Sequence, residues 1–187
     1  GGEVRGQLVP QNVDVTRAEL QGQQENPAVM NADGISGVGY VTLNPKAETI
    51  VSLVSVQGFV PFLDADIGPV HLHSGFAGQN GPVFLPLFPV DGSETVFKGD
   101  ESDAIAEIDF AAIAKGQTYI NVHSAENPSG EVRGQLVPRN VDVTRAKLQG
   151  QQENPAVINA DGISGVGYVT LNSAAETIVS LVSVQGF

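Results

Sequence analysis

The chain has 187 residues, with 9 Lys or Arg against 21 Asp or Glu, and its formal net charge is −12. This charge repels nucleic acid and anionic lipid surfaces, so we expect neither as a partner. The 22 Gly and 11 Pro, with no Cys and no Trp, exclude a disulfide-bonded fold and favour short strands joined by turns. No apolar run approaches the roughly 20 residues that a membrane-spanning helix needs, so membrane insertion is not expected.

The predicted strands are rich in β-branched and aromatic residues, and Gly, Asn, Asp or Pro separates each from the next. They cover residues 37–44, 49–59, 69–73, 82–88, 95–97, 118–123 and 131–137. Residues 109–116 differ, because Phe110, Ile113 and Ala114 have helical spacing and Gly116 can end the helix. We therefore expect an all-β fold, an antiparallel sandwich or barrel with one short helix in a crossover loop.

The chain repeats itself with an offset of 128 residues. Residues 1–59 and 129–187 differ at only six of 59 positions: Gly1/Ser129, Gln11/Arg139, Glu19/Lys147, Met30/Ile158, Pro45/Ser173 and Lys46/Ala174. Such a unit is too long for a solenoid repeat and has the usual size of a self-sufficient domain. We expect residues 11–138 to be one complete unit, residues 1–10 to be the last strand of a preceding unit, and residues 139–187 to begin the following unit. The stretch is then an excerpt of a longer repetitive chain.

The joint between units lies within residues 134–150, where Pro138 is the only proline and no glycine falls between the two ends. Flexible linkers are usually rich in Gly and Ser, whereas this stretch offers Val, Thr and Leu. Because Pro fixes φ and removes a backbone donor, it suits a strand that leaves one sheet for the next. We expect a tight joint at Pro138 and at its counterpart Pro10. The alternative is an ordinary surface loop with free hinge motion.

Three blocks of the complete unit follow one another in a characteristic order: AELQGQQENPAV (18–29), VHLHSGFAGQNGPV (70–83) and YINVHSAENPSGEVRGQL (119–136). Together they resemble the chordin-like (CHRD) domain family, and the resemblance covers residues 14–138. The motif positions are Gly81, Pro82, Asn121, Asn127, Pro128, Gly130, Glu131, Arg133 and Gly134. The resemblance implies an extracellular β-sandwich of immunoglobulin-like or Cu/Zn superoxide dismutase-like shape in a secreted or cell-surface protein. Tandem, nearly identical CHRD copies resemble microbial members of the family.

The chain has three histidines, His71, His73 and His123, and they are the candidate metal ligands. Because side chains alternate along a strand, all three imidazoles are expected opposite the aliphatic residues of their strands, on the outer face. If the two strands are neighbours, the imidazoles can converge on one cation, with copper or zinc favoured. The resemblance to superoxide dismutase agrees, since its copper ligands include a His-x-His strand and a later His. The alternative is that the imidazoles hydrogen-bond the 74–82 loop and the 124–130 turn without metal.

Other candidate sites carry less weight. Two acidic loops could offer oxygen ligands to calcium, although solvated loops are the preferred interpretation: Asp64 and Asp66, and Asp100, Glu101 and Asp103. Glu131 and Arg133 are two residues apart on one strand face, which predicts a surface or edge ion pair. The serines that follow His73 and His123 point away from the imidazoles or lie in turns, so no catalytic nucleophile is expected.

Three functions remain open. The leading hypothesis is a structural, extracellular or cell-surface protein in which neighbouring identical repeats or subunits form a rod, fibre or filament. The second is a multivalent protein-binding or adhesion module, in which many weak sites act together. The third is a copper/zinc redox enzyme of superoxide dismutase type, which is disfavoured because the chain has no fourth His to complete a copper set or bridge two metals. We therefore expect no enzyme activity.

Overall fold

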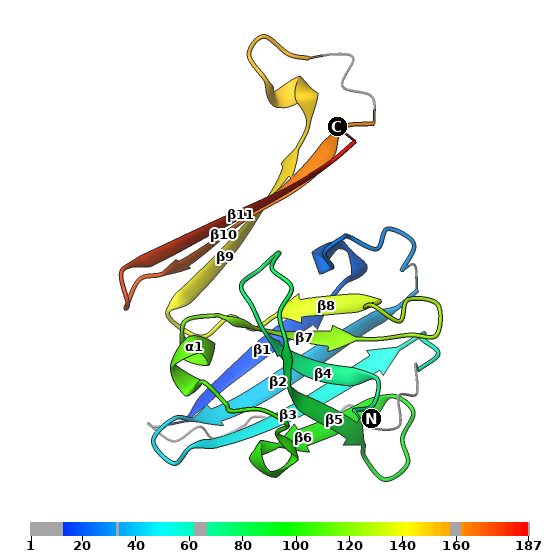
Figure 1. Cartoon of the computed structure of the whole chain (residues 1–187), viewed down its shortest axis with the longest axis vertical. Helices are drawn as coiled ribbons and strands as arrows, with labels where there is room; N and C mark the ends of the chain where they lie inside the picture. The colour runs from blue at the N-terminus through cyan, green and yellow to red at the C-terminus, as the bar shows by residue number, and fades with distance from the viewer. Residues whose placement is uncertain (1–12, 33, 62–66, 158–161, 187) are drawn as a thin grey trace, which may run out of the picture.

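The computed structural model describes residues 13–32, 34–61, 67–157 and 162–186, and they form two antiparallel sheets (Figure 1). The first sheet has eight strands in the order β1-β2-β3-β6-β5-β4-β7-β8. Their bounds are β1 Asp14–Leu20, β2 Ser36–Asn44, β3 Thr49–Gln57, β4 Val70–Ser74, β5 Val83–Pro89, β6 Val96–Asp100, β7 Thr118–Val122 and β8 Val132–Gln135. The all-β fold predicted from the sequence is confirmed.

The first sheet curls until its two edge strands meet, so it forms a nearly closed barrel. Gln21, directly after β1, and Arg133 of β8 exchange two backbone hydrogen bonds, of 2.9 and 3.2 Å. The edges can approach because Gly134 has no side chain: a Cβ there would lie 2.6 Å from the Glu19 carbonyl oxygen. The close backbone approach at Gly134 therefore serves to close the barrel.

One hydrophobic core fills the barrel. Alternate residues of each strand point inward, as in β3, where Ile50, Val54 and Val56 are fully buried between neighbours that are partly or fully exposed. The short helix α1 (Phe110–Ala114) contributes Ile113 to this core. Asp109 caps the helix by accepting a hydrogen bond from the Ala112 backbone, and the helix lies in the crossover from β6 to β7, as expected.

The second sheet repeats the first three strands of the barrel. It consists of β9 (Val141–Leu148), β10 (Ser164–Asn172) and β11 (Thr177–Gln185) in the order β11-β10-β9. The register is the same in both copies: Tyr40 pairs with Leu53 in the barrel, and Tyr168 pairs with Leu181 in the second sheet. The one-turn 3-10 helix η1 (Gly22–Gln24) is likewise repeated as η3 (Gly150–Gln152).

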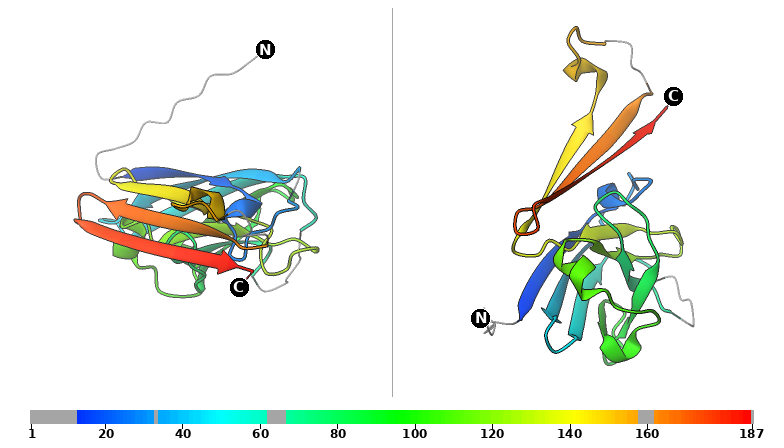
Figure 2. Two further views of the ribbon diagram at one scale, coloured as in Figure 1. Left: turned by 90° about the horizontal axis from the view of Figure 1, so that it is seen from above. Right: turned by 60° about the vertical axis from the view of Figure 1, so that its left-hand side comes forward.

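The second sheet leans against one end of the barrel beside β8 and α1 (Figure 2). Tyr168 is 6 % exposed there and donates a hydrogen bond of 3.3 Å to the Gln23 carbonyl. Its ring lies over Gly78, where a Cβ would come within 2.7 Å of the ring. Nearby, the Asn172 side chain donates to the Ala114 carbonyl at 3.4 Å.

The helices of the described ranges contain three to five residues. None of them is long and apolar enough to cross a membrane.

Candidate metal centre

The two histidine strands are neighbours, as the metal hypothesis requires. Strand β4 lies between β5 and β7, and His73 of β4 is paired with Tyr119 of β7. His71 is paired with Asn121 in the same ladder. His123 follows the last residue of β7, and its backbone donates to the Pro69 carbonyl at 2.8 Å, which holds it beside the start of β4. Residues that are about 50 positions apart in sequence thus lie on one patch of the sheet.

The three imidazoles converge. One ligand nitrogen from each of His71, His73 and His123 lies within 4.8 Å of the others. The ring centroids are 4.8 Å apart for His71 and His123, 5.7 Å for His71 and His73, and 6.0 Å for His73 and His123. The side chains project opposite the barrel core, as alternation predicts. His71 and His73 are nevertheless buried, with 4 % and 8 % exposed, because loops cover the outer face of the sheet here, and His123 is half-buried.

Backbone carbonyls fix the tautomer of each ring. His71 Nε2 donates to the carbonyls of Gly68 at 2.8 Å and Ile67 at 3.1 Å. His73 Nδ1 donates to Gly81 O, and His123 Nδ1 donates to the Pro128 carbonyl, each at 2.9 Å. A carbonyl can only accept, so these nitrogens carry the ring hydrogens. The lone pairs therefore belong to Nδ1 of His71 and to Nε2 of His73 and His123.

The hydrogen bonds of the alternative interpretation of the histidines are present in the structure. The imidazoles do hydrogen-bond the 74–82 loop and the 124–130 turn, through Gly81 and Pro128. Metal-ligating histidines usually use the second ring nitrogen in this way, which fixes ring orientation and makes the ligand nitrogen more basic. The backbone bonds are therefore compatible with rings that bind a cation.

Burial keeps two of the rings neutral. It lowers the pKa of His73 to about 4, although the bond to Gly81 opposes the shift. Burial also lowers the pKa of His123, against the opposing bond to Pro128. Nε2 of each ring is buried and has no hydrogen-bond partner among the described residues. Neutral imidazole is the form that binds metal, so these nitrogens are ready-made ligands.

The donor set fits copper or zinc. Three imidazole nitrogens suit borderline-soft cations, and metal–nitrogen bonds of about 2.0–2.1 Å place two ligands of one ion at most about 4.2 Å apart. A pair at the full 4.8 Å separation would therefore close by about 0.6 Å on binding. Three ligands leave a further coordination position for water or another molecule.

A stack of buried rings supports the centre from one side. Tyr119 lies parallel to His73, with ring centroids 4.8 Å apart and an interplanar angle of 13°. The Arg133 guanidinium lies over the other side of the Tyr119 ring, 3.3 Å from its centroid. Arg133 also donates to the Phe76 carbonyl at 3.0 Å and to Asn80 Oδ1 at 3.3 Å, so it fastens the 74–82 loop over the histidines.

The expected ion pair between Glu131 and Arg133 is wrong. Both residues are almost fully buried, and each has other partners. Glu131 accepts hydrogen bonds from Ser124 Oγ and from Asn127 Nδ2, the latter at 2.7 Å. The loops that cover β7 and β8 explain the difference, because they bring their own donors to the buried carboxylate. These bonds hold the 124–130 turn, and so hold the Pro128 carbonyl that orients His123.

Comparison with known protein families shows which family the chain belongs to. Residues 16–136 match the family model of the CHRD domain, which is 121 of the 187 residues. The chain belongs to the CHRD domain family. No curated protein and no solved structure matched the chain.

The remaining motif positions of the CHRD domain shape the loops around the histidines. A Cβ on Gly81 would lie 1.6 Å from the Ser74 carbonyl oxygen, so only Gly fits where this loop returns to β4. The neighbouring Pro82 carbonyl accepts from the Ser74 backbone at 3.0 Å. Gly130 has a φ of +132°, a conformation that side chains other than Gly rarely adopt. Asn121 is buried between His71 and Arg133 in the strand register.

Sequence reasoning missed Glu25, which follows η1 and is buried near Arg133 and Glu131. Burial raises its pKa to about 8, while Arg133 nearby opposes the shift and Glu131 adds to it. Its Oε1 atom and Asn121 Oδ1 are both buried without a hydrogen-bond partner among the described residues. The Glu25 Oε2 atom and the Asn121 amide both approach Gly130. The sequence could have pointed to Glu25 only through its position inside the first CHRD block, residues 18–29.

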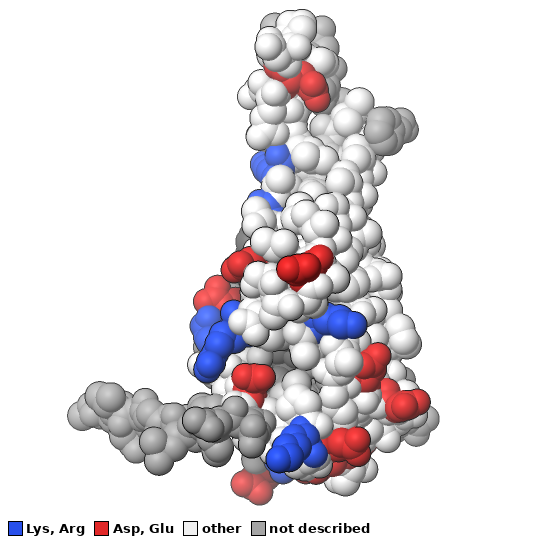
Figure 3. Space-filling view, turned by 90° about the vertical axis from the view of Figure 1, so that its left-hand side faces the viewer, with Lys and Arg blue, Asp and Glu red and all other residues white. Residues whose placement is uncertain are grey.

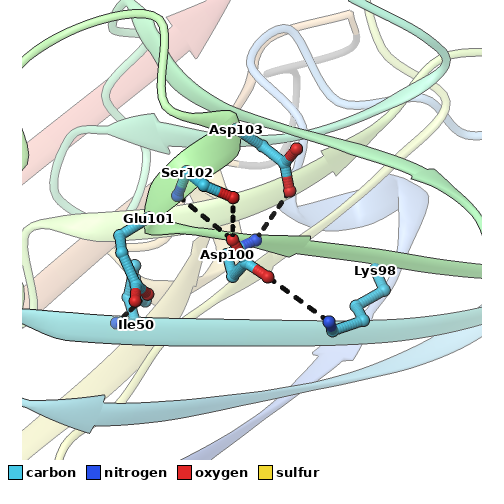
Figure 4. A network of polar contacts seen from close by, with 6 residues as sticks. All are labelled: Ile50, Lys98, Asp100, Glu101, Ser102 and Asp103. Carbon is cyan, nitrogen blue, oxygen red and sulfur yellow. Dashed lines mark hydrogen bonds and ion pairs between the residues drawn. The ribbon is translucent and has the colours of Figure 1, made fainter.

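The carboxylates of the acidic segment at the end of β6 already have hydrogen-bond or ion-pair partners within the chain (Figure 4). Asp100 accepts from the backbone and hydroxyl of Ser102, and Asp103 accepts from the Asp100 backbone, which caps the 3-10 helix η2 (Glu101–Asp103). Glu101 accepts from the Ile50 backbone at 3.0 Å, and Lys98 donates to Asp100 at 3.3 Å. These contacts show that the carboxylates stabilise the loop, and none of them indicates a calcium site. Asp64 and Asp66 lie outside the described residues.

The joint after the CHRD domain is short. The Pro138 carbonyl accepts from the Val141 backbone at 2.9 Å, so a single turn connects β8 to β9. Val141 is buried against Gly116, where a Cβ would lie 2.7 Å from the valine side chain. The structure thus places a packed contact at the expected joint. Pro10, the other predicted joint residue, lies outside the described residues.

Proposed function

We propose that this protein is a structural, extracellular or cell-surface array of CHRD domains, and that each complete domain binds one copper or zinc ion on a histidine centre. The observation that carries the metal assignment is the orientation of the rings. Backbone carbonyls accept a hydrogen bond from one nitrogen of each of His71, His73 and His123, and one nitrogen of each ring lies within 4.8 Å of the others. The ion ties together two strands and two covering loops, so it stabilises the domain.

Metal titration of the purified chain tests the centre. We expect one copper or zinc ion per chain, because its described residues contain one such histidine cluster. A hundredfold excess of metal over the dissociation constant should stabilise the fold by about 3 kcal/mol. His123→Ala is the variant of choice, because His123 is the least buried of the three and its loss disturbs packing least.

The proposal fails if the native chain takes up less than about 0.2 ion, or if His123→Ala binds and is stabilised as well as the native chain. Asn127→Ala is the control, since this residue supports the turn through Glu131 and offers the ion no ligand. It should weaken the fold and leave the metal stoichiometry unchanged.

The packed joint supports the array. Tyr168 is 6 % exposed against the preceding domain, whereas Tyr40, the same residue in the earlier copy, is 44 % exposed. An identical tyrosine therefore becomes buried when a CHRD domain precedes it. A head-to-tail contact of this kind repeats from unit to unit without closing, and such contacts generate linear assemblies. The joint thus favours a rod over independent beads.

Spin labels on two introduced cysteines test the stiffness of the joint. Lys98→Cys and Thr177→Cys place one label on the barrel and one on the second sheet, both at exposed positions. We expect a narrow distance distribution in the native background and with Tyr40→Ala, and a broad one with Tyr168→Ala. A broad distribution in the native background would contradict the rod and favour the multivalent binding module.

A redox role is the remaining proposal, with the weakest support. The three nitrogens leave a coordination position open, but no fourth His exists to complete a copper set. Turnover of superoxide by the copper-loaded chain, lost in His123→Ala, would move the assignment from structural ion to redox centre.

A further inference from the structure

A cleft of about 370 Å³ lies between the barrel and the second sheet, and its size suits a small organic molecule. All three strands of the second sheet contribute to one wall of this cleft, through Arg145, Lys147, Val166, Tyr168 and Leu181. The two basic residues of β9 are paired with Tyr168 and Val166 of β10, so these four side chains share one face of the sheet. Their counterparts in the barrel are outward-facing residues such as Tyr40. The cleft therefore lies at the joint, on the opposite side of the sheet from the face that corresponds to the barrel core.

The sheet wall of the cleft carries two positive charges. In the barrel, Arg17 forms an ion pair with Glu19, with 2.7 Å between the two charged groups. The second copy keeps this arginine as Arg145 but has Lys147 in place of the glutamate. Neither Arg145 nor Lys147 has an ion-pair partner within the described part of the chain. The cleft is therefore a cationic site in a protein whose net charge is −12.

The surroundings of these cations are mostly neutral. In the view of Figure 3, the part of the molecule that the second sheet forms is mostly uncharged, with small areas of Lys and Arg on it. Val166 and Leu181 lie beside the two cations on the same wall of the cleft. A molecule that binds there thus meets positive charge next to apolar surface.

The barrel wall of the cleft adds a buried acid and further apolar surface. Glu25 contributes to this wall although it is only 6 % exposed, and its Oε1 atom has no hydrogen-bond partner among the described residues. Because burial raises its pKa to about 8, Glu25 is protonated at neutral pH and adds no negative charge that would repel an anion. Ala28 and the exposed Met30 extend this wall with apolar atoms.

The chemistry of the two walls indicates the kind of ligand. Arginine and lysine bind carboxylates through charge-assisted hydrogen bonds, and the aliphatic side chains suit an apolar group attached to the carboxylate. An inorganic anion would use the charges alone and leave the apolar surface in water. We infer that the cleft binds a small organic acid, whose carboxylate contacts Arg145 and Lys147 and whose apolar body lies between the two walls. This site goes beyond the proposed function, since it uses neither the histidines nor a metal ion.

Calorimetric titration of the full chain with phenylacetate tests the inference. We expect one molecule to bind per chain with a dissociation constant of about 1 mM or lower. Added salt should weaken this binding, because Arg145 and Lys147 are exposed. Phenylacetamide, which has the same body without the charge, should bind at least about tenfold more weakly, and so should inorganic phosphate. A short peptide with a free carboxylate on a final phenylalanine offers the same chemistry, and tighter binding of this peptide would identify a chain end as the natural ligand.

Lys147→Glu is the variant that tests the cations. It restores the residue of the first copy, which the same strand accommodates, and it gives Arg145 a partner like that of Arg17. The affinity for phenylacetate should therefore fall by at least about tenfold. Lys46→Glu is the matched control, because it changes the net charge by the same amount at an exposed position outside the cleft. It should bind phenylacetate as the native chain does.

Two results would overturn the inference. One is equal affinity of Lys147→Glu and the native chain for phenylacetate, and the other is equal affinity of the native chain for phenylacetate and phenylacetamide. The spin-label distances separate this failure from a failure of the rod. If the joint is rigid and about 10 mM phenylacetate still does not bind, the organic-acid site is wrong and the rod remains.

Discussion

Replacement of the buried Glu25 by Gln tests directly whether this side chain is protonated in the folded protein. Burial raises the pKa of Glu25 from 4.5 to about 8, so the folded protein holds this side chain protonated at neutral pH. The unfolded chain ionises it at the lower pKa. Glu25 therefore contributes its full stability below about pH 4.5, and this contribution is lost as the pH rises through about 8. Gln has nearly the same shape as the protonated acid and cannot ionise.

The expected magnitude follows from the shift. One pKa unit corresponds to about 1.4 kcal/mol, and pH 7 lies about 2.5 units above 4.5, so keeping Glu25 protonated costs the folded state about 3 kcal/mol at that pH. Between about pH 5 and pH 7, the unfolding free energy of Glu25→Gln should therefore rise by about 2 to 3 kcal/mol relative to the native chain. The charged groups nearest Glu25 are Arg133 and Glu131. Glu25 also lines a cleft between the barrel and the second sheet, and Arg145 and Lys147 of the second sheet line its other side.

Urea unfolding followed by circular dichroism at several pH values measures this difference. The matched control is Glu153→Gln, since Glu153 occupies the same position of the second copy and is exposed. Its pH profile should run parallel to that of the native chain. A parallel profile for Glu25→Gln as well would refute the reasoning, because it would mean that Glu25 is ionised in the folded state.

Four further substitutions test core packing, buried hydrogen bonding and helix capping. Ile50→Ala should cost about 2 to 5 kcal/mol, whereas Ile178→Ala at the matching exposed position should cost less than about 1 kcal/mol by urea unfolding. Gln135→Leu should cost about 2 to 4 kcal/mol, because its buried amide nitrogen lies within hydrogen-bond distance of the Gly75, Gly116 and Thr118 carbonyls and its two hydrogens would no longer be available to them; an unchanged midpoint would count against this. Asp109→Ala removes the cap of α1 and should lower the free energy of unfolding by about 1 kcal/mol in thermal unfolding. Among the backbone amides, those of the helix should exchange faster.

The sequence predicted most of the strands, because alternation and turn residues act over a few positions. The helix at residues 109–116 was also predicted, from its apolar spacing and the glycine that ends it. Strand β1 did not stand out by composition, since its exposed positions include Asp14, Arg17 and Glu19, and only the family block indicated it. Its place in the fold depends on its partners, β2 along one edge and β8 through the Gln21 bridge.

The candidate metal site was predicted in part. Alternation placed the three histidines opposite the core, but only the order of the strands could bring β4 beside β7. Burial of this outer face was not predictable from the strands alone, because the cover comes from loops far away in the sequence. For the same reason the Glu131–Arg133 pair was wrong, and the roles of Tyr119 and Glu25 were missed.

The two copies of the repeat separate local from tertiary causes. The same residues form the same three-stranded sheet, with the same register, whether or not strands such as β4, β5, β7 and β8 pack against it, so side-chain alternation and turn chemistry determine this unit by themselves. The surroundings differ between the copies, and they decide that Ile50 is buried and Ile178 exposed, and that Tyr168 is buried and Tyr40 exposed. Burial and the convergence of the histidines depend on which distant segments meet, and that is a property of the whole fold.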